Sequence, residues 1–220
     1  MHWPEGINKK ENKMNIIYLQ NDLSDAQVVD LSNTTDLAVD TELTGLDVKG
    51  DHLCLVQLRA RDSDDFYLVQ IRDNQEYPNL KKVLSNPKIT KIFHYARMDI
   101  LMIYKRLGVW TMPVFCTKIG VLLARPKKSH ALHNVLRELF KIEMDGSETC
   151  SDWTKKLTKN QQKYAATDVL YLHMLKDYLT DELRDKNRFD LAKKCFEFLP
   201  TRCSIDMDWG ERDIFGYNPK

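Results

Sequence analysis

The sequence predicts an α/β or α+β fold in which helices are layered on one β-sheet, and three observations support this. Short apolar runs separated by polar turns fill the first half of the chain, while apolar residues at helical spacing dominate the second half. Helical segments alternate with strands from residue 80 onward, which is typical of helices packed on a sheet. The length of 220 residues suits one domain with additions, or at most two small domains.

Five apolar runs have the length and the flanking turn residues of strands. The sequence therefore predicts strands over residues 15–20, 37–41, 53–58, 66–71 and 90–94, in an order that these patterns do not determine. Helices are predicted from capping residues, apolar spacing and the stop signal at Asn86-Pro87. They cover residues 24–31, 80–84, 96–107, 117–124, 132–140, 159–183 and 190–198.

Composition and charge exclude some classes of protein. Hydrophobic residues make up 43% of the chain and charged residues 30%, which is the balance of a folded protein and not of a disordered one. Lys and Arg total 33 against 32 Asp and Glu, so the net charge is only +1. A protein that binds nucleic acid through bulk positive charge is therefore excluded. The charge balance does not exclude a local site at which a metal ion neutralises a substrate phosphate.

The cysteines and the apolar runs indicate in which cellular compartment the protein is expected. The chain has 5 cysteines, widely spaced and without a C-x-x-C pair, so neither a disulfide framework nor a zinc ribbon is expected. A reducing, cytoplasmic compartment fits this use of cysteine. Residues 1–15 are polar with no secretory signal after them, and the longest uncharged apolar run, 119–124, is far shorter than the ~20 residues that span a bilayer. We therefore expect no membrane partner.

Four acidic residues stand in unusual sequence surroundings. Asp40 and Glu42 end the run LAVDTEL, and their i, i+2 spacing on a strand places both carboxylates on one face. A strand that runs out into an acidic turn is the plainer interpretation of this pair. Asp99 lies in the first turn of a predicted helix, where the helix dipole alone favours an aspartate. Asp168 is enclosed by small and apolar residues, four positions after Tyr164, so both side chains share one helix face.

Such carboxylates could converge on a metal site. A buried carboxylate needs a partner, and several together repel one another unless a dication lies between them. Mg²⁺ and Mn²⁺ prefer hard oxygen ligands and keep waters that substrate oxygens can replace. Two such ions about 4 Å apart stabilise the attacking and the leaving oxygen of a phosphoryl displacement. Tyr164 would then lie near the attacking water.

Three motifs resemble those of a known nuclease superfamily. They are D-T-E at 40–42, H-x-x-x-x-D from His94 to Asp99, and Y-x-x-x-D from Tyr164 to Asp168. In this order they resemble the exonuclease motifs of the DEDD superfamily, and the tyrosine matches the DEDDy branch that includes ribonuclease D. The stretches KIFHYARMDI, VFCTKIGVLLAR, SDW, YAATDVLYLHMLKD, CFEFLPTR and DWGERDIF are similar to the short alphaproteobacterial ribonuclease D-like proteins of the nano-RNase C type. The similarity extends over residues 14–216.

The resemblance implies a fold, an activity and a set of site residues. The fold would be ribonuclease H-like, a mixed five-stranded sheet flanked by helices with a helical C-terminal half. The activity would be 3′-to-5′ exonucleolytic hydrolysis of RNA to nucleoside 5′-monophosphates with two divalent ions, Mg²⁺ or Mn²⁺. The metal ligands would be Asp40, Glu42, Asp99 and Asp168. Tyr164 would orient a metal-bound hydroxide, since a phenol with a pKa of about 10 is a poor base at neutral pH.

The resemblance also implies substrate contacts, each with a plainer alternative. Leu46 would wedge between the terminal bases, or it packs within its turn. Tyr95 would stack on a base, or it belongs to the core. The stretch 125–130 is either a solvated basic surface or a cap on a phosphate. The expected substrate-binding residues are Thr41, Leu43, Leu46, His94, Tyr95, Lys118, Arg125 and His130.

Some positions depart from the family pattern. Cys116 stands where longer ribonuclease D proteins have an aspartate, and we expect a buried structural thiol there rather than a nucleophile. Ala131 occupies an expected glycine position, and the segment 146–150 lacks the expected glutamines. The helical domains of longer ribonuclease D proteins do not follow Leu183, which favours short substrates.

The sequence divides into a polar extension over residues 1–13, an exonuclease domain over 14–199 and a tail over 200–220. Large apolar residues in the tail, Trp209 and Phe215 among them, would form a patch that monomers rarely tolerate in water. We therefore expect a subunit contact there, in a ring-like homo-oligomer of even order such as the resembling family forms. A closed assembly would narrow access to each site and favour short substrates.

Three functions compete at this point. The first is a 3′-5′ exoribonuclease that acts on the 3′ ends of short oligoribonucleotides, down to dinucleotides. The second keeps the chemistry but trims longer RNA or single-stranded DNA, which normally needs an extended basic groove. The third is an inactive nucleic-acid-binding scaffold on the same fold, which the presence of all four carboxylates and Tyr164 disfavours.

Overall fold

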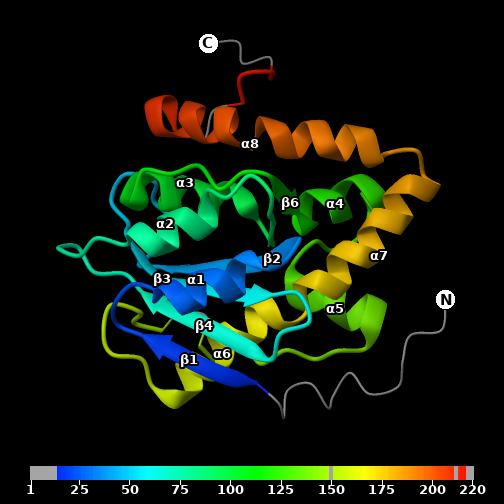
Figure 1. Cartoon of the computed structure of the whole chain (residues 1–220). Helices are drawn as coiled ribbons and strands as arrows, with labels where there is room; N and C mark the ends of the chain where they lie inside the picture. Colours follow the sequence, from blue (N-terminus) through cyan, green and yellow to red (C-terminus); the bar gives the residue numbers. More distant parts are fainter. Residues whose placement is uncertain (1–13, 149–150, 211–212, 217–220) are drawn as a thin grey trace.

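A mixed six-stranded sheet runs through the centre of the molecule, in the order β1-β4-β3-β2-β5-β6 (Figure 1). The computed structural model describes residues 14–148, 151–210 and 213–216. β3 pairs antiparallel with β2 and β4, whereas the pairs β1–β4, β2–β5 and β5–β6 are parallel. The strands are β1 (Asn15–Leu19), β2 (Asp36–Leu43), β3 (Leu53–Ala60), β4 (Asp65–Gln70), β5 (Thr90–Phe93) and β6 (Val114–Cys116).

The predicted fold class is confirmed, with one strand more than the five expected. The predicted strands correspond to β1–β5. The additional strand, β6, has only 3 residues and follows Pro113, so no periodic pattern could mark it. It lengthens the sheet beyond β5, where Phe93 pairs with Cys116.

Helices cover both faces of the sheet (Figure 1). α6 packs across β1 to β4, α3 contacts β3, β5 and β6, and α7 contacts β2 and β5. α8 forms an outer layer on α3 and α4, at the top of Figure 1. The helices are α1 (Asp25–Ser32), α2 (Pro78–Leu84), α3 (Ala96–Leu107), α4 (Thr117–Ala124), α5 (Leu132–Phe140), α6 (Lys159–Leu170), α7 (Leu172–Asp185) and α8 (Phe189–Trp209).

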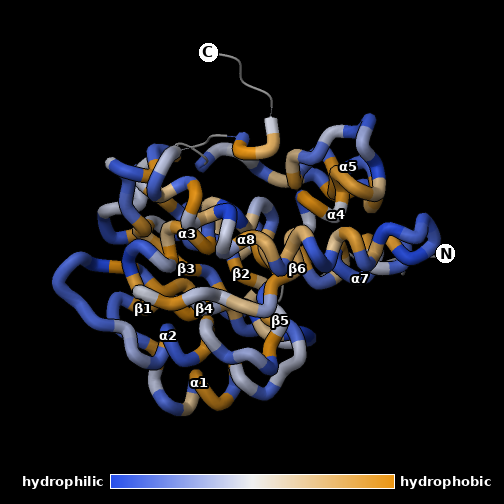
Figure 2. Tube along the Cα trace, turned by 90° about the horizontal axis from the view of Figure 1, so that it is seen from above, coloured by the Kyte–Doolittle hydropathy of each residue, from blue (hydrophilic) through white to orange (hydrophobic). Residues whose placement is uncertain are grey.

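The core lies between the sheet and these helices. Every residue of β3 is buried, because helices cover the strand on both faces, and its apolar run therefore shows no alternation. Figure 2 shows the hydrophobic segments gathered along the strands and the inner helices, with hydrophilic segments toward the outside. The N-termini of α1 and α6 are fixed by capping boxes at Ser24 and Thr158.

The single helix predicted over 159–183 is wrong, because it divides into α6 and α7 at Tyr171. Arg59, buried in β3, donates a hydrogen bond of 3.1 Å from Nη1 to the carbonyl oxygen of Leu170. A side chain distant in sequence thus satisfies a carbonyl at the end of α6. The apolar spacing continues through the break, so periodicity alone could not reveal it.

The helix predicted over 190–198 continues to Trp209, so the first part of the predicted tail, residues 200–209, is helical. Pro200 has no backbone N–H and normally ends a helix. Tertiary contacts hold the second half of α8 nonetheless. Asp206 is buried there and forms ion pairs of 2.5 Å with Nε of Arg97 on α3 and 2.7 Å with Arg202.

The polar extension 1–13, Cys150 and Tyr217 lie outside the described residues. Within the described ranges, no helix combines the length and the apolar character needed to cross a bilayer.

Candidate active site

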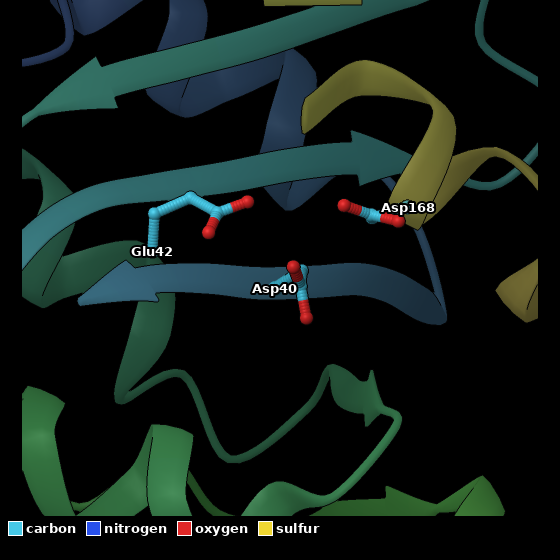
Figure 3. Close-up of side chains that lie close together, drawn as sticks. All are labelled: Asp40, Glu42 and Asp168. Atoms are coloured by element: carbon cyan, nitrogen blue, oxygen red, sulfur yellow. The ribbon is translucent and has the colours of Figure 1, made fainter. Parts of the chain in front are cut away.

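Three carboxylates meet where β2 passes beneath α6. Asp40 and Glu42 project from the same face of β2, as their alternate positions on the strand require. Asp168 reaches that face from the last turn of α6, the helix that packs across it. One carboxylate oxygen from each residue lies within 4.8 Å of the others. Figure 3 shows Glu42 and Asp168 facing each other, with Asp40 between them.

Asp99 approaches the same end of β2 from the first turn of α3. It is 6% exposed, and the hydroxyl of Thr41 donates a hydrogen bond of 2.6 Å to its Oδ1. The hydroxyl of Thr41, one of the predicted substrate-binding residues, thus holds a carboxylate of the cluster. Glu42 is oriented in a similar way, because Nε2 of Gln57 donates to its Oε1 at 3.3 Å.

The four carboxylates oppose one another electrostatically. Burial raises the pKa of Asp40 well above its usual value, and the charges of Asp99, Asp168 and Glu42 raise it further. Burial, with repulsion from Asp168 and Asp99, raises the pKa of Glu42 to about 9. Burial likewise raises the pKa values of Asp99 and Asp168 to about 7.

The donor set fits a divalent cation. No lysine or arginine among the described residues forms an ion pair with these four carboxylates. The ligands on offer are carboxylate oxygens, which are the hard donors that Mg²⁺ and Mn²⁺ prefer. A dication between them would replace mutual repulsion by attraction and would favour the ionised state of each carboxyl group.

Tyr164 lies on α6 one turn before Asp168, as the sequence predicts. It is partly exposed, and its ring centroid is 6.0 Å from that of Trp153. Tyr164 lines a cavity of about 300 Å³ whose other charged lining residues include Glu143, Glu148 and Lys163. Tyr164 is therefore both near the carboxylates and open to solvent.

The predicted base contacts lie at and after the end of β2 and at the start of α3. Leu46 is 73% exposed in the turn between β2 and β3, so it does not simply pack there. Leu43 is half-buried at the end of β2. Tyr95 caps α3 in a left-handed conformation, with φ 83°, which is rare for a bulky residue. Nζ of Lys118 lies 3.6 Å from the centroid of its ring.

The side chains predicted to contact phosphate differ in how far other protein groups already bind them. Arg125 forms ion pairs with Glu138 at 3.2 Å and Glu182 at 3.5 Å, so structural partners already engage its guanidinium. His130 is exposed. The ring nitrogens of His94 lie 2.8 Å from Oγ1 of Thr117 and 2.9 Å from the carbonyl oxygen of His130.

Sequence reasoning missed Gln57, which pairs with Asp40 across β2 and β3 and orients Glu42. A signal was present, because a single amide interrupts the apolar run LCLVQL. A buried amide requires a polar partner, and the acidic end of the neighbouring strand offers one.

Comparison with known proteins defines the class of enzyme. A family model described as 3′-5′ exonuclease matches residues 15–184, a span that includes all four carboxylates and Tyr164. The chain therefore belongs to the 3′-5′ exonuclease family. Ribonuclease D from Jannaschia sp. is 29% identical over 156 residues, which are 69% of this chain and 40% of the relative. The exosome complex exonuclease RRP6 of Saccharomyces cerevisiae is 29% identical over 191 residues, 81% of this chain and 25% of the relative. The chain thus spans less than half the length of these relatives.

Solved structures place the chain within that family more narrowly. NrnC from Brucella melitensis, bound to pGG, matches with a TM-score of 0.86 and 39% identity over 93% of this chain and 100% of that one. The predicted resemblance to the short, nano-RNase C type is thereby confirmed. Escherichia coli RNase D matches with a TM-score of 0.76 and 22% identity, over 91% of this chain and 52% of that one, and shares the fold.

Proposed function

We propose that the chain is a metal-dependent exoribonuclease that removes nucleoside 5′-monophosphates from the 3′ ends of short oligoribonucleotides, dinucleotides included. The observation that carries this proposal is the convergence of Asp40, Glu42 and Asp168, with Asp99 beside them. The match to pGG-bound NrnC over its whole length supports the short substrate.

Two divalent ions, Mg²⁺ or Mn²⁺, would be held by Asp40, Glu42, Asp99 and Asp168. When bound, such ions stabilise the attacking and leaving oxygens of phosphodiester hydrolysis. A structure of Brucella melitensis NrnC contains Mg²⁺, which supports the choice of metal class. Tyr164 would orient the attacking water through its hydroxyl, since it lies one helical turn from Asp168.

Substrate would lie across the exposed side of this cluster. The exposed side chain of Leu46 suits a wedge between the two terminal bases, because apolar surface left in water gains from being covered by a base. Leu43, Tyr95 and Lys118 would line the path of the chain, with Tyr95 stacking on a base. His130 would contact a phosphate.

A time course on end-labelled RNAs of two to twenty nucleotides, side by side with DNA of the same sequence, tests the substrate proposal. We expect Mg²⁺-dependent release of 5′-monophosphates, fastest from the shortest RNAs and abolished by chelation. Faster turnover of twenty-nucleotide RNA or of single-stranded DNA would favour the trimming alternative. Binding of RNA without hydrolysis, in the presence of either Mg²⁺ or Mn²⁺, would identify an inactive scaffold.

We also propose a homo-oligomer of even order, closed into a ring. Apolar side chains gather on and after α8, where Phe198, Trp209, Ile214 and Phe215 are 37%, 63%, 52% and 80% exposed. Burial of these side chains between subunits would remove a patch that a monomer rarely carries. Light scattering on the wild type and on an Ile214→Ser, Phe215→Ser variant tests this. A wild-type protein that is monomeric at micromolar concentration would contradict the proposed oligomer. An unchanged oligomer in the variant would show that Ile214 and Phe215 do not contribute to the subunit contact.

A cytoplasmic location is proposed from the thiols. Cys54, Cys116, Cys195 and Cys203 are all free, which fits a reducing compartment. Fractionation of the source cells with compartment markers tests it, and recovery with secreted proteins would contradict it.

A further inference from the structure

The turn between β2 and β3, defined as residues 44–52, presents a large apolar side chain to solvent. Leu46 is 73% exposed there. Backbone pairing between the two strands reaches as far as Thr44, whose N–H donates to the carbonyl oxygen of His52 at 3.1 Å. An apolar side chain in water gains free energy by folding back onto the protein. The residues between Thr44 and His52 therefore need further contacts to keep Leu46 in this position.

The carboxylate of Asp51 supplies such contacts from inside the turn. Its Oδ1 accepts a hydrogen bond of 2.7 Å from the hydroxyl of Thr44, and its Oδ2 accepts one of 2.7 Å from the backbone N–H of Asp47. These hydrogen bonds lower the pKa of Asp51, so its carboxylate is ionised at neutral pH. A Cβ atom on Gly45 would lie only 2.5 Å from Oδ2 of Asp51, so the turn needs glycine at that position.

Lys105 holds the turn from outside. It lies in the last turn of α3, the helix that carries Asp99 in its first turn. Its Nζ lies 2.8, 3.0 and 3.2 Å from the carbonyl oxygens of Val48, Lys49 and Asp51. An ammonium group has three N–H donors, so these three carbonyls engage all of them. Within the described ranges, no carboxylate forms an ion pair with Lys105.

We propose that Lys105 and Asp51 are positioning residues that brace the turn, so that Leu46 is in place to separate the two terminal bases before the substrate binds. The proposal rests on the proposed function, in which Leu46 acts as the wedge. A turn that is already ordered spares the complex the entropy cost of ordering it, and the saving lowers KM. Neither residue contacts RNA in this account, because the donors of one and both carboxylate oxygens of the other are engaged within the protein.

Steady-state kinetics of the full chain test the effect on the substrate. We expect Lys105→Met to raise KM for a 5′-phosphorylated RNA dinucleotide about threefold, with kcat unchanged. Lys49→Met is the matched control. It removes a positive charge from the exposed surface of the same turn and should leave KM unchanged. Lys105→Arg retains N–H donors and should recover part of the loss.

Two comparisons connect the effect to Leu46. Lys105→Met should add little to KM in a Leu46→Ala background, because both changes remove the same contact with the bases. A dinucleotide whose 3′ nucleotide lacks its base offers no second base to separate, so its KM should be equal in the wild type and in Lys105→Met. Asp51→Ala should act in the same direction as Lys105→Met, which keeps the test available if the lysine variant does not fold.

Hydrogen exchange reports on the turn without substrate. The backbone N–H groups of Asp47 and Gly50 are hydrogen-bonded within the turn. We expect Lys105→Met to accelerate exchange over residues 44–52 several-fold, since a segment released from its anchor opens more often. Lys49→Met should leave the exchange unchanged. Mass spectrometry of the full chain after short labelling times measures both.

The outcomes distinguish the brace from its alternatives. A raised KM in Lys105→Met with unchanged exchange would mean that Lys105 contacts the RNA, and an equal rise in Lys49→Met would indicate attraction by charge alone. Faster exchange with unchanged KM would show that the order of the turn does not matter to the substrate. Each of these results would overturn the proposal.

Failure of the proposed function would be recognised separately. A wild type that binds the dinucleotide without hydrolysing it would refute the proposed exoribonuclease. The Kd values of the same variants, measured by fluorescence anisotropy, would then decide whether Lys105 acts through Leu46. A wild type that does not bind the dinucleotide would refute both proposals.

Discussion

Strand β2 carries two aspartates four residues apart in opposite electrostatic surroundings. Asp36, at its start, is 6% exposed and forms ion pairs with Arg61 at 2.9 Å and with Lys176. Burial alone would raise the pKa of Asp36, but the hydrogen bonds and charges of Lys176 and Arg61 outweigh it and lower the pKa. At Asp40 the charges that act on the carboxyl group are those of the described carboxylates Asp99, Asp168 and Glu42, and together with burial they raise its pKa.

The difference distinguishes a carboxylate that is paired within the fold from one that we propose to bind a metal ion. At Asp36 the fold has supplied cations, which offset the cost of burying a charge. At Asp40 the fold has gathered like charges and left them uncompensated, an arrangement that costs stability and is typical of sites that bind a ligand. The same strand therefore carries a carboxylate neutralised by cations at one end and, at the other, carboxylates that we propose as a cation site.

The largest effect is expected from Asp40→Asn. Loss of one ligand charge should reduce the rate of hydrolysis by at least about a hundredfold, since metal-mediated charge stabilisation supplies several kcal/mol to the transition state. The metal-free variant should be at least as stable as the wild type, because one repulsive charge is gone. Initial rates and thermal melting in EDTA measure both. Near-normal rates in a folded variant would refute the metal role of Asp40.

Tyr164→Phe should have the next largest effect. The ring would still lie against Trp153, while the hydroxyl that orients water is lost, so kcat should fall by about tenfold to a hundredfold. The melting temperature and Mn²⁺ affinity should stay at the wild-type values. A marked loss of stability instead would show that the hydroxyl serves the fold, and the catalytic assignment would be wrong.

Asp36→Asn is the structural counterpart. It leaves Arg61 and Lys176 without their shared carboxylate, and we expect the free energy of unfolding to fall by about 2 kcal/mol, below the usual cost for a fully buried pair because both cations retain some solvent. The rate per folded molecule should not change. Urea unfolding with parallel activity assays checks this, and a stability loss no larger than that of Asp40→Asn would break the contrast between the two aspartates.

The two ends of β2 should also respond differently to pH. In the cluster, the folded pKa values lie above the unfolded values near 4, so the folded protein binds more protons and metal-free stability falls as pH rises from about 4 to about 9. Asp36 has a lowered pKa, so its contribution is complete above about pH 4 and is lost only in more acidic solution. Urea unfolding in EDTA from pH 5 to 9 should show a decline that Asp40→Asn reduces and Asp36→Asn leaves unchanged. A flat profile in the wild type would contradict the repulsive cluster.

Leu46→Ala should have the smallest effect. The side chain is 73% exposed, so its removal should leave the melting temperature unchanged. If it wedges between bases, KM should rise about fivefold, equivalent to about 1 kcal/mol of lost apolar contact. A drop in melting temperature with KM unchanged would show that Leu46 only packs.

The sequence predicted most of this site because strand and helix spacing constrain where side chains point. Asp40 and Glu42 share a face by alternation, and Tyr164 lies one turn from Asp168, so both relations follow from local geometry. Features that depend on distant partners could not be predicted. The break at Tyr171 is accompanied by a hydrogen bond from Arg59 on β3, and the part of α8 after Pro200 is held to α3 by the ion pair of Asp206 with Arg97.

The cationic environment of Asp36 could not be predicted from the sequence either, because its partners are also distant along the chain. Arg61 lies 25 residues away and Lys176 lies 140 residues away, so no local pattern connects them. Asp36 and Asp40 stand in one apolar run and look alike in sequence. The packing of α7 on β2 adds Lys176 to Arg61 as a partner of the first, whereas the packing of α6 on β2 adds Asp168 to Glu42 and Asp99 as neighbours of the second.

Direct measurement of Mn²⁺ binding by electron paramagnetic resonance tests the central claim that the carboxylate cluster is a divalent metal site. The wild type at pH 8 should bind two Mn²⁺ ions per chain, and Mg²⁺ should displace them. Asp36→Asn should bind the same number, whereas Asp40→Asn should lose at least one. No bound Mn²⁺ in the wild type, or equal binding by Asp40→Asn, would contradict the account.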